Sequence, residues 1–302
     1  MAEIVGIGTA VFDWMMILDR FPDDDEKMSS RESKTQCGGP CAVAMIAASK
    51  LGVSSAWHGK LGDDMYGMII KANIDKYGVD TSSVSIVPGA RSSSCVVLSN
   101  QSNGHRACIG GGARSESLDL EPEEVDLELL KGAKYLHVDG PSLKGAIYAA
   151  QKMHEFGGKV SMDLDGEVGA REPLIALADI LIPSERSARL LAGTDDIEEA
   201  AKIIQDRYHP ETLLITMGPE GGIIMQDGEI AHYPAFPVKA IDSNGSGDVF
   251  HGAFLAAKVK GFSDMEAARF ASATSAIKCT HFGASEGAPS WETVEAFLKE
   301  RE

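Results

Sequence analysis

The pattern of hydrophobic positions in the second half of the chain alternates between two periods. Short apolar runs at residues 135–138, 160–163, 180–183 and 213–216 are typical of β-strands. Between and after them, apolar residues recur with the period of an amphipathic helix. The predicted helices cover residues 146–156, 187–191, 197–208, 249–259, 265–280 and 291–298. This alternation predicts an α/β fold with a mainly parallel central sheet covered by helices.

Polar residues end or follow three of the predicted strands. These residues are Asp163, Ser184 and Thr216. Ligands of parallel sheets bind at the carboxyl ends of the strands, so we expect the three residues at one functional edge of the sheet.

The first third of the chain is less regular. Residues 4–9 predict a strand and residues 41–51 predict a helix, whereas residues 14–36 and 92–112 have β character. No clear interdomain linker occurs, so we expect one domain over residues 1–302 with a small discontinuous β-sheet inserted in it. Such a sheet suits a lid that closes over a substrate, and it equally suits an extension of the main sheet.

The formal net charge of −17 over 302 residues narrows the range of partners. Nucleic acids and anionic membrane surfaces bind basic patches, so neither is expected as a partner. An anionic nucleotide remains compatible, because Mg²⁺ bridges ATP to acidic proteins. The chain begins with no basic leader, and no apolar run approaches the ~20 residues of a membrane span, so we expect a cytoplasmic protein.

The five cysteines agree with a reducing compartment, since an odd number cannot pair completely. Cys37 and Cys41 have the spacing C-x3-C, but a second pair of ligands is missing. Packing in the core and zinc binding both remain open for them, and packing is the simpler interpretation.

The segment from Asp242 to Asp248 carries the strongest chemical signal. It reads Asp-Ser-Asn-Gly-Ser-Gly-Asp and directly precedes a helical pattern. Small residues in such a turn expose backbone N–H groups at a helix N-terminus, where the helix dipole favours anions such as phosphate. Asp248 would then face a hydroxyl group beside the phosphate. A turn whose two aspartates only cap backbone amides has the same composition.

Two common nucleotide-binding motifs fail in this chain. No G-x-x-x-x-G-K-[ST] is present, so the chain has no P-loop signature. Gly6 and Gly8 provide two glycines of a G-x-G-x-x-G motif, but the third is missing and no amphipathic helix follows. These features argue against a Rossmann dehydrogenase.

Four separated segments together match the pattern of one family. Gly6-Ile7-Gly8 leads to Asp13, and Gly38-Gly39-Pro40 opens a helical run. Leu61-Gly62-Asp63-Asp64 follows, and Asp242–Asp248 has the form of a D-T-x-G-A-G-D signature. On these segments, the whole chain resembles the ribokinase-like, or PfkB, carbohydrate kinases. The resemblance implies a three-layer α/β sandwich with a mainly parallel sheet and a small β lid.

The resemblance also implies roles for residues of the catalytic and sugar-binding sites. Asp248 would be the base that accepts the proton of a sugar hydroxyl group. The backbone of Gly245, Ser246 and Gly247 would form an anion hole for the transferred phosphoryl group, since this reaction depends mainly on positioning and charge stabilisation. The residues implied for sugar binding are Asp13, Gly38, Gly39 and Lys27.

Further roles implied by the resemblance concern ATP and cations. The residues implied for ATP binding are Thr216, Gly218, Gly221 and Ser184. Asp242 and Gly283 correspond to a monovalent-cation site, suited to K⁺, that many family members have. Glu185 lies where it would reach a water molecule bound to Mg²⁺, or where it would be a solvated charge at a helix start.

The chain departs from the family pattern at three places. Val43 stands where the first signature has Asn, which removes one polar contact to the sugar. Ser184 and Ser187 replace the Asn and Glu of the N-x-x-E motif, which orders magnesium and phosphates. Ser246 replaces the usual alanine, a small change that should keep the turn.

Within the family, the sulfofructose kinase and ketohexokinase branches look closest. The residues behind this impression lie at 248–253, 269–272 and 278–280. Lys27 falls where sulfofructose kinases carry a lysine, although a routine exposed lysine would look the same. Residues 139–141 lack the arginine expected beside a sulfonate, so no sulfonate substrate is assigned.

The assignments predict an ATP-dependent kinase that phosphorylates a primary hydroxyl group of a ketose-type or related sugar, with Mg²⁺ and, by resemblance, K⁺. Two alternatives stay open: a nucleoside kinase of the same fold, and a sugar- or nucleotide-binding protein impaired in catalysis.

Small β lids of this family often form a dimer contact, so the resemblance implies a homodimer. The apolar lid residues that fit this contact, or packing on the main domain, are Met15, Met16, Ile17, Val96 and Val97.

Overall fold

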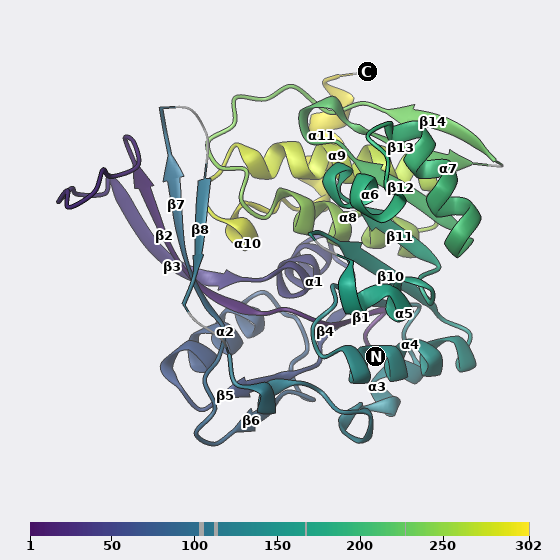
Figure 1. Cartoon of the computed structure of the whole chain (residues 1–302), viewed down its shortest axis with the longest axis horizontal. Helices are drawn as coiled ribbons and strands as arrows, with labels where there is room; N and C mark the ends of the chain where they lie inside the picture. The colour runs from purple at the N-terminus through teal and green to yellow at the C-terminus, as the bar shows by residue number, and fades with distance from the viewer. Residues whose placement is uncertain (103–105, 112–113, 167, 227, 302) are drawn as a thin grey trace.

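An eight-stranded sheet forms the centre of the computed structural model, which describes residues 1–102, 106–111, 114–166, 168–226 and 228–301 (Figure 1). In spatial order the strands are β14 (Glu229–Tyr233), β13 (Gly222–Gln226), β12 (Thr212–Thr216), β11 (Ile180–Pro183), β10 (Lys159–Leu164), β9 (Tyr135–Val138), β1 (Ile4–Ile7) and β4 (Ser55–Trp57). All neighbours from β12 to β4 are parallel, whereas β13 and β14 are antiparallel. The predicted α/β fold with a mainly parallel sheet is confirmed.

Helices cover both faces of this sheet (Figure 1). They are α1 (Pro40–Lys50), α2 (Met65–Lys76), α3 (Leu127–Lys131), α4 (Leu143–Glu155), α5 (Glu172–Ile175), α6 (Glu185–Ala192), α7 (Ile197–Tyr208), α8 (Ser246–Val259), α9 (Asp264–Cys279), α10 (Ala284–Gly287) and α11 (Trp291–Lys299), with 3₁₀ turns η1 (Glu116–Leu118), η2 (Pro122–Glu124), η3 (Gly169–Arg171) and η4 (Gly218–Glu220). Within the described ranges, no helix is long and apolar enough to span a bilayer.

Polar N-cap residues determine where many of these helices begin. The side chains of Asp64, Asp126, Asp196, Ser263 and Ser290 each accept a hydrogen bond from a backbone N–H in the first turn of the helix that follows. Such bonds satisfy N–H groups that have no acceptor inside the helix.

The strands divide their side chains between two apolar cores. In β11, Ile180 and Ile182 face one core and Leu181 faces the other. The first core includes side chains of α1, α8 and α9, among them the fully buried Phe254 and Phe270, and the second includes side chains of α4, α6 and α7. Burial on both faces explains why these strands are continuous apolar runs in the sequence.

The predicted helix boundaries agree with the structure where one face is clearly apolar. The helix predicted at residues 197–208 is α7, and the helix predicted at 291–298 is α11 with one more residue. The pattern does not predict α2, in which only Gly67, Ile70 and Ile74 are buried.

A second, four-stranded sheet projects from the main body of the protein (Figure 1). In spatial order its strands are β3 (Glu32–Gly38), β2 (Val11–Leu18), β7 (Ser94–Asn100) and β8 (Arg106–Gly110). They come from the two segments expected to form an inserted sheet, residues 14–36 and 92–112, of which residues 103–105 and 112 lie outside the described residues. A separate short pair joins β5 (Lys60–Gly62) to β6 (Ser85–Val87).

Candidate active site

The N-terminal turn of α8 forms the first part of the site. Gly245 has a positive φ of 75°, which glycine adopts without strain, and α8 begins at the next residue, Ser246. The first N–H groups of a helix have no acceptor within the helix. A Cβ atom at Gly247 would meet no heavy atom within 4 Å, so the backbone there is open to approach. The turn therefore offers donors for an anion.

Asp248 lies in this first turn and is only partly exposed. Desolvation, together with the nearby negative charge of Asp163, raises the pKa of the Asp248 carboxyl group to about 7. A general base works best when its pKa is near the working pH, because it is then charged and still accepts a proton in the transition state. Asp248 thus has the electrostatic properties of a base, beside donors suited to an anion.

The projecting sheet contributes Asp13 and Gly38 from its neighbouring strands β2 and β3. A Cβ atom at Gly38 would overlap the Asp13 carboxylate, so the carboxylate lies directly against the glycine backbone. Desolvation raises the pKa of Asp13 to about 7; the Gln36 side chain opposes this shift, and the negative charge of Asp248 adds to it. The structure therefore brings Asp13 and Asp248 close enough for the charge of Asp248 to raise the pKa of Asp13.

The Asp139 carboxylate binds the backbone at two places: at Thr9, just after β1, and at Cys41, in the first turn of α1. Both of its carboxylate oxygens accept the N–H of Thr9 at 3.0 Å, and Oδ2 also accepts the N–H of Cys41 at 3.1 Å. Gly39 precedes α1 with φ 94°, and a Cβ atom there would lie 2.7 Å from the carbonyl oxygen of Thr9. These contacts explain why the Gly38-Gly39 segment needs glycine at its second position.

A buried ion pair lies behind Asp248. His251 follows Asp248 by one helical turn, and its Nε2 lies 3.2 Å from Oδ1 of Asp163 on β10. Although desolvation acts in the opposite direction, the charge of His251 lowers the pKa of Asp163, and the charge of Asp163 raises the pKa of His251. These opposite shifts both favour the charged forms of the pair, which lies beside Asp248.

Asp242 ties the other end of the glycine-rich turn to the end of α9. Its carboxylate accepts the N–H of Asn244 and the N–H of Gly283, both at 2.9 Å. The Nζ of Lys278, which is fully buried, donates a hydrogen bond of 2.7 Å to the Asp242 carbonyl oxygen and lies 3.7 Å from its Oδ2. The sequence pattern assigns no role to Lys278, because its contact with Asp242 joins residues that are 36 positions apart.

Comparison with known proteins identifies the family. Residues 1–291 match the family described as pfkB family carbohydrate kinase. The chain belongs to this family. The PfkB-family kinase is therefore a phosphotransferase that acts on a carbohydrate hydroxyl group.

Several known relatives match nearly the whole kinase. Ribokinase from Haemophilus influenzae is 26% identical over 298 residues, which cover 97% of this chain and 97% of that protein. Fructokinase from Klebsiella pneumoniae is 30% identical over 257 residues, which cover 80% and 81%. The structure of Arabidopsis thaliana ribokinase complexed with ribose and ATP matches with a TM-score of 0.84 and 27% identity, over 99% of each chain. The ribokinase-like fold and the family are confirmed, and the closer branch stays a prediction.

The residues predicted to bind ATP lie at the carboxyl ends of β11 and β12. Ser184 and Thr216 are directly paired across these ends. The Ser184 hydroxyl accepts the N–H of Ser187 at 3.3 Å and so caps α6. Gly218 and Gly221 both have positive φ values, of 56° and 84°, in the loop after β12.

Two charged residues predicted for the site, Glu185 and Lys27, are not available to it: one is paired with another side chain, and the other lies elsewhere. Glu185 Oε1 accepts a hydrogen bond of 2.6 Å from Arg189 one turn along α6, so this carboxylate is already paired. Lys27 is exposed in the loop between β2 and β3. This loop follows the Ile17–Glu32 pair, whereas Asp13 pairs with Gln36 farther along the two strands. Within one copy of the chain, the structure does not bring Lys27 to the site.

The described residues contain no group of three or more His, Cys, Asp or Glu side chains that could hold a metal ion. Cys37 and Cys41 are both buried in the first apolar core, in agreement with packing rather than zinc binding. A magnesium ion that enters with a nucleotide needs few protein ligands, because phosphate oxygens and water molecules supply the rest.

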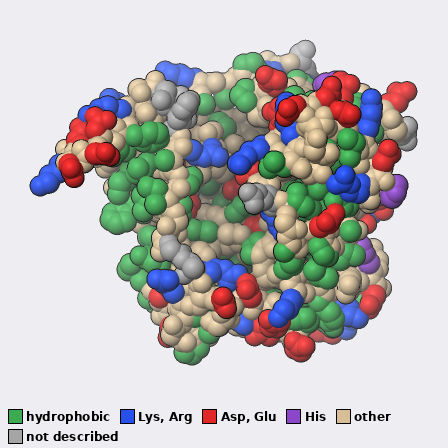
Figure 2. Space-filling model, in the orientation of Figure 1, with side chains coloured by type: hydrophobic (Ala, Val, Ile, Leu, Met, Phe, Trp, Pro, Cys, Tyr) green, Lys and Arg blue, Asp and Glu red, His purple; other side chains and the backbone are tan. Residues whose placement is uncertain are grey.

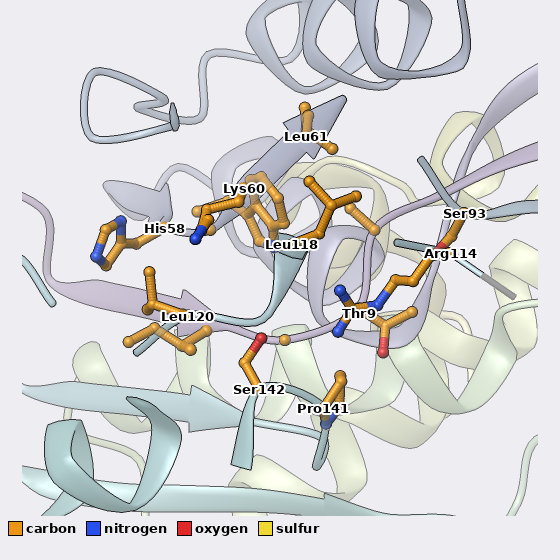
Figure 3. A pocket seen from close by; sticks show the side chains of 15 residues that line it. Thr9, His58, Lys60, Leu61, Ser93, Arg114, Leu118, Leu120, Pro141 and Ser142 are labelled. Atoms are coloured by element: carbon orange, nitrogen blue, oxygen red, sulfur yellow. The ribbon is translucent and has the colours of Figure 1, made fainter. Parts of the chain in front are cut away.

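The surface is hollowed beside the projecting sheet, with Lys and Arg side chains around the hollow (Figure 2). A pocket beside Thr9 is lined by polar and apolar side chains, and Arg114 extends into it (Figure 3). The Arg114 guanidinium is paired with Asp119. Asp13 and Asp248 do not line this pocket, which adjoins the site through Thr9, the partner of Asp139.

For the buried pair of His251 and Asp163, we expect removal of one partner to destabilise the protein more than removal of both charges. His251→Ala should destabilise the protein by about 3–5 kcal/mol, because it leaves the Asp163 carboxylate buried without its partner. Adding Asp163→Asn should recover part of this loss, since the unpaired charge is then removed. Urea unfolding of His251→Ala, Asp163→Asn and the double variant measures both effects.

The exposed pair of His154 and Asp179, 2.9 Å apart, provides the matched control. His154→Ala should cost no more than about 1 kcal/mol. A double variant of the buried pair as unstable as the sum of its single variants would contradict the ionised state of the pair.

Proposed function

We propose that this PfkB-family kinase transfers the γ-phosphoryl group of ATP to a primary hydroxyl group of a ketose-type or related sugar. The observation that supports this proposal most directly is the position of Asp248. Its carboxyl group, with a pKa near 7, lies in the first turn of α8 next to the N–H groups that follow Gly245, and it interacts electrostatically with Asp13. A carboxylate suited to act as a base, N–H donors suited to an anion and a second carboxylate that could accept sugar hydroxyl groups thus lie close together, which supports the proposal.

In the proposed reaction, Asp13 and the backbone of Gly38 hold hydroxyl groups of the sugar, since a carboxylate accepts hydrogen bonds from neighbouring O–H donors. Asp248 accepts the proton of the attacking hydroxyl group while the hydroxyl oxygen bonds to the γ-phosphorus; the bond from that phosphorus to the β-phosphate oxygen breaks, and ADP leaves. The N–H groups of Ser246 and Gly247 stabilise the charge on the phosphoryl oxygens during transfer. ATP supplies the phosphoryl group when it is bound.

The carboxyl ends of β11 and β12 fit the nucleotide, because Ser184, Thr216 and the glycines after β12 present hydroxyl and backbone groups at one edge. Magnesium would be held mainly by phosphates and water, since Glu185 is paired with Arg189. All five cysteines are free thiols, which supports a cytoplasmic location.

Replacement of the base tests this mechanism. Asp248→Ala should lower kcat by about 10²–10⁴-fold, as expected when a general base is removed. The measurement is coupled ADP release, on the best substrate from a panel of ketoses, aldoses, nucleosides and their phosphorylated or sulfonated forms. Asp24→Ala, in the exposed loop between β2 and β3, is the control and should leave the rate unchanged. An unchanged rate for Asp248→Ala would exclude Asp248 as the base.

The pKa of Asp248 also predicts the pH dependence of the reaction. The base works only when deprotonated, so kcat/KM should rise with pH and level off above an apparent pKa of about 7. Asp13, whose pKa is also raised to about 7, should steepen the acidic limb, because its protonation removes a hydrogen-bond acceptor for the sugar. Initial rates between pH 5.5 and 9 measure the profile. A flat profile across pH 7 would contradict the assignment.

We also propose that the projecting sheet is a lid through which two copies of the chain form a homodimer. Trp14, Val96 and Ile109 lie side by side on one face of this sheet, and Trp14 and Ile109 are 48% and 55% exposed. Exposed apolar patches of this kind mark interaction surfaces. Met15 and Val97, on the opposite face, are buried.

Charge on the exposed face should break the dimer. We expect Ile109→Lys to convert a dimer into a monomer, as measured by size-exclusion chromatography with light scattering, because burying an unpaired ammonium group in an apolar contact is costly. Met68→Lys, at a 64% exposed apolar position on α2, is the matched control and should keep the mass of the unmodified protein. A monomeric mass for the unmodified protein would refute the dimer.

A further inference from the structure

Lys278 is a buried charge that the proposed reaction does not use. It lies near the end of α9, where its side chain is fully excluded from water. Taking an ammonium group out of water is unfavourable unless the protein provides a specific partner. That partner is Asp242, through the carbonyl oxygen at 2.7 Å and the carboxylate at 3.7 Å. Both oxygens belong to the first residue of the glycine-rich turn.

These are the oxygen atoms expected to hold a monovalent cation. Carbonyl and carboxylate oxygens are the ligands that hard cations prefer. Here the Lys278 ammonium group already binds the Asp242 carbonyl oxygen. Gly283, the second residue of the expected site, directs its N–H rather than an oxygen at Asp242 Oδ2. Two positive charges cannot share this buried position without strong repulsion, so the residues present do not fit a bound K⁺ ion.

We propose that Lys278 takes the place of the monovalent cation and holds the turn before α8 in position as a built-in ammonium group. Lys278 acts through Asp242, so it is a positioning residue. Asp242 in turn accepts the N–H of Asn244 inside the turn and the N–H of Gly283 beyond α9. The charge of Lys278 therefore fixes the segment from which the anion-binding N–H groups extend. Only the effect on catalysis rests on the proposed kinase function.

The first test compares cations on the unmodified protein. Kinase rate and melting temperature are measured in chloride salts of K⁺, Na⁺ and tetramethylammonium at equal ionic strength. We expect the same rate and the same melting temperature in all three salts. Activation by K⁺ over tetramethylammonium, or a melting temperature raised by K⁺ alone, would overturn the proposal.

The second test removes the ammonium group. In tetramethylammonium chloride, Lys278→Ala should lose about 10²-fold in activity, the loss expected when a catalytic group is misplaced by a remote change. K⁺ or ammonium ions should restore much of that activity, because the shortened side chain leaves their position free. Lys278→Met should show the same loss without recovery, since its longer apolar side chain fills the space. A Lys278→Ala variant that K⁺ does not rescue would count against the proposal.

Melting temperature provides a readout that does not depend on catalysis. K⁺ should raise the melting temperature of Lys278→Ala above its value in tetramethylammonium, because a ligand that binds only the folded state stabilises it. Lys202→Ala, at an exposed position of α7, should show no such response. If no sugar supports a kinase rate, the proposed function fails, whereas the melting temperatures still decide the role of Lys278. If Lys278→Ala does not fold, the cation comparison on the unmodified protein decides it.

Discussion

The burial of several carboxylates around one helix N-terminus is the constraint on which the rest of this structure depends. Asp13 on β2, Asp139 just after β9 and Asp163 on β10 lie near Asp248 in the first turn of α8, in a protein that already carries a net charge of −17. Desolvation and mutual repulsion both oppose their ionisation. The surrounding chain must therefore supply donors and positive charge at defined places.

The negative charge of each carboxylate is offset by different partners, and its pKa depends on those partners. Asp163 is paired with His251, whose charge lowers the pKa of Asp163, whereas Asp139 accepts hydrogen bonds from two backbone N–H groups. Asp248 has no comparable partner of opposite charge at contact distance among the described residues, so its pKa rises toward neutrality. Asp13 and Asp248 both have a pKa raised to about 7, and of the two only Asp248 lies in the first turn of α8, beside the N–H groups suited to an anion.

The sequence predicts the parts of this arrangement that depend on local pattern. Strands buried on both faces are continuous apolar runs, and the turn before α8 is visible in its glycines and aspartates. Contacts between distant elements are different, because they depend on packing. Lys278 and Asp242 are 36 residues apart and meet only because α9 returns alongside α8. Lys27 is the opposite case: the sequence predicts it for the site, but the packing of β2 against β3 leaves it in a loop away from the site.

The strands of the projecting sheet carry Asp13 and Gly38, whereas Asp248 belongs to a helix packed in the main body. The residues proposed to hold the sugar and the proposed base therefore stand on separate structural elements. Any tilt of the sheet relative to α8 changes the distance between the hydroxyl acceptor and the base. With the sheet tilted away, Asp13 and Gly38 are separated from Asp248 and from the N–H groups at the start of α8, so the proposed catalytic site is incomplete. Under the proposed roles, the position of the sheet would therefore decide whether a sugar hydroxyl group held by Asp13 lies within reach of Asp248.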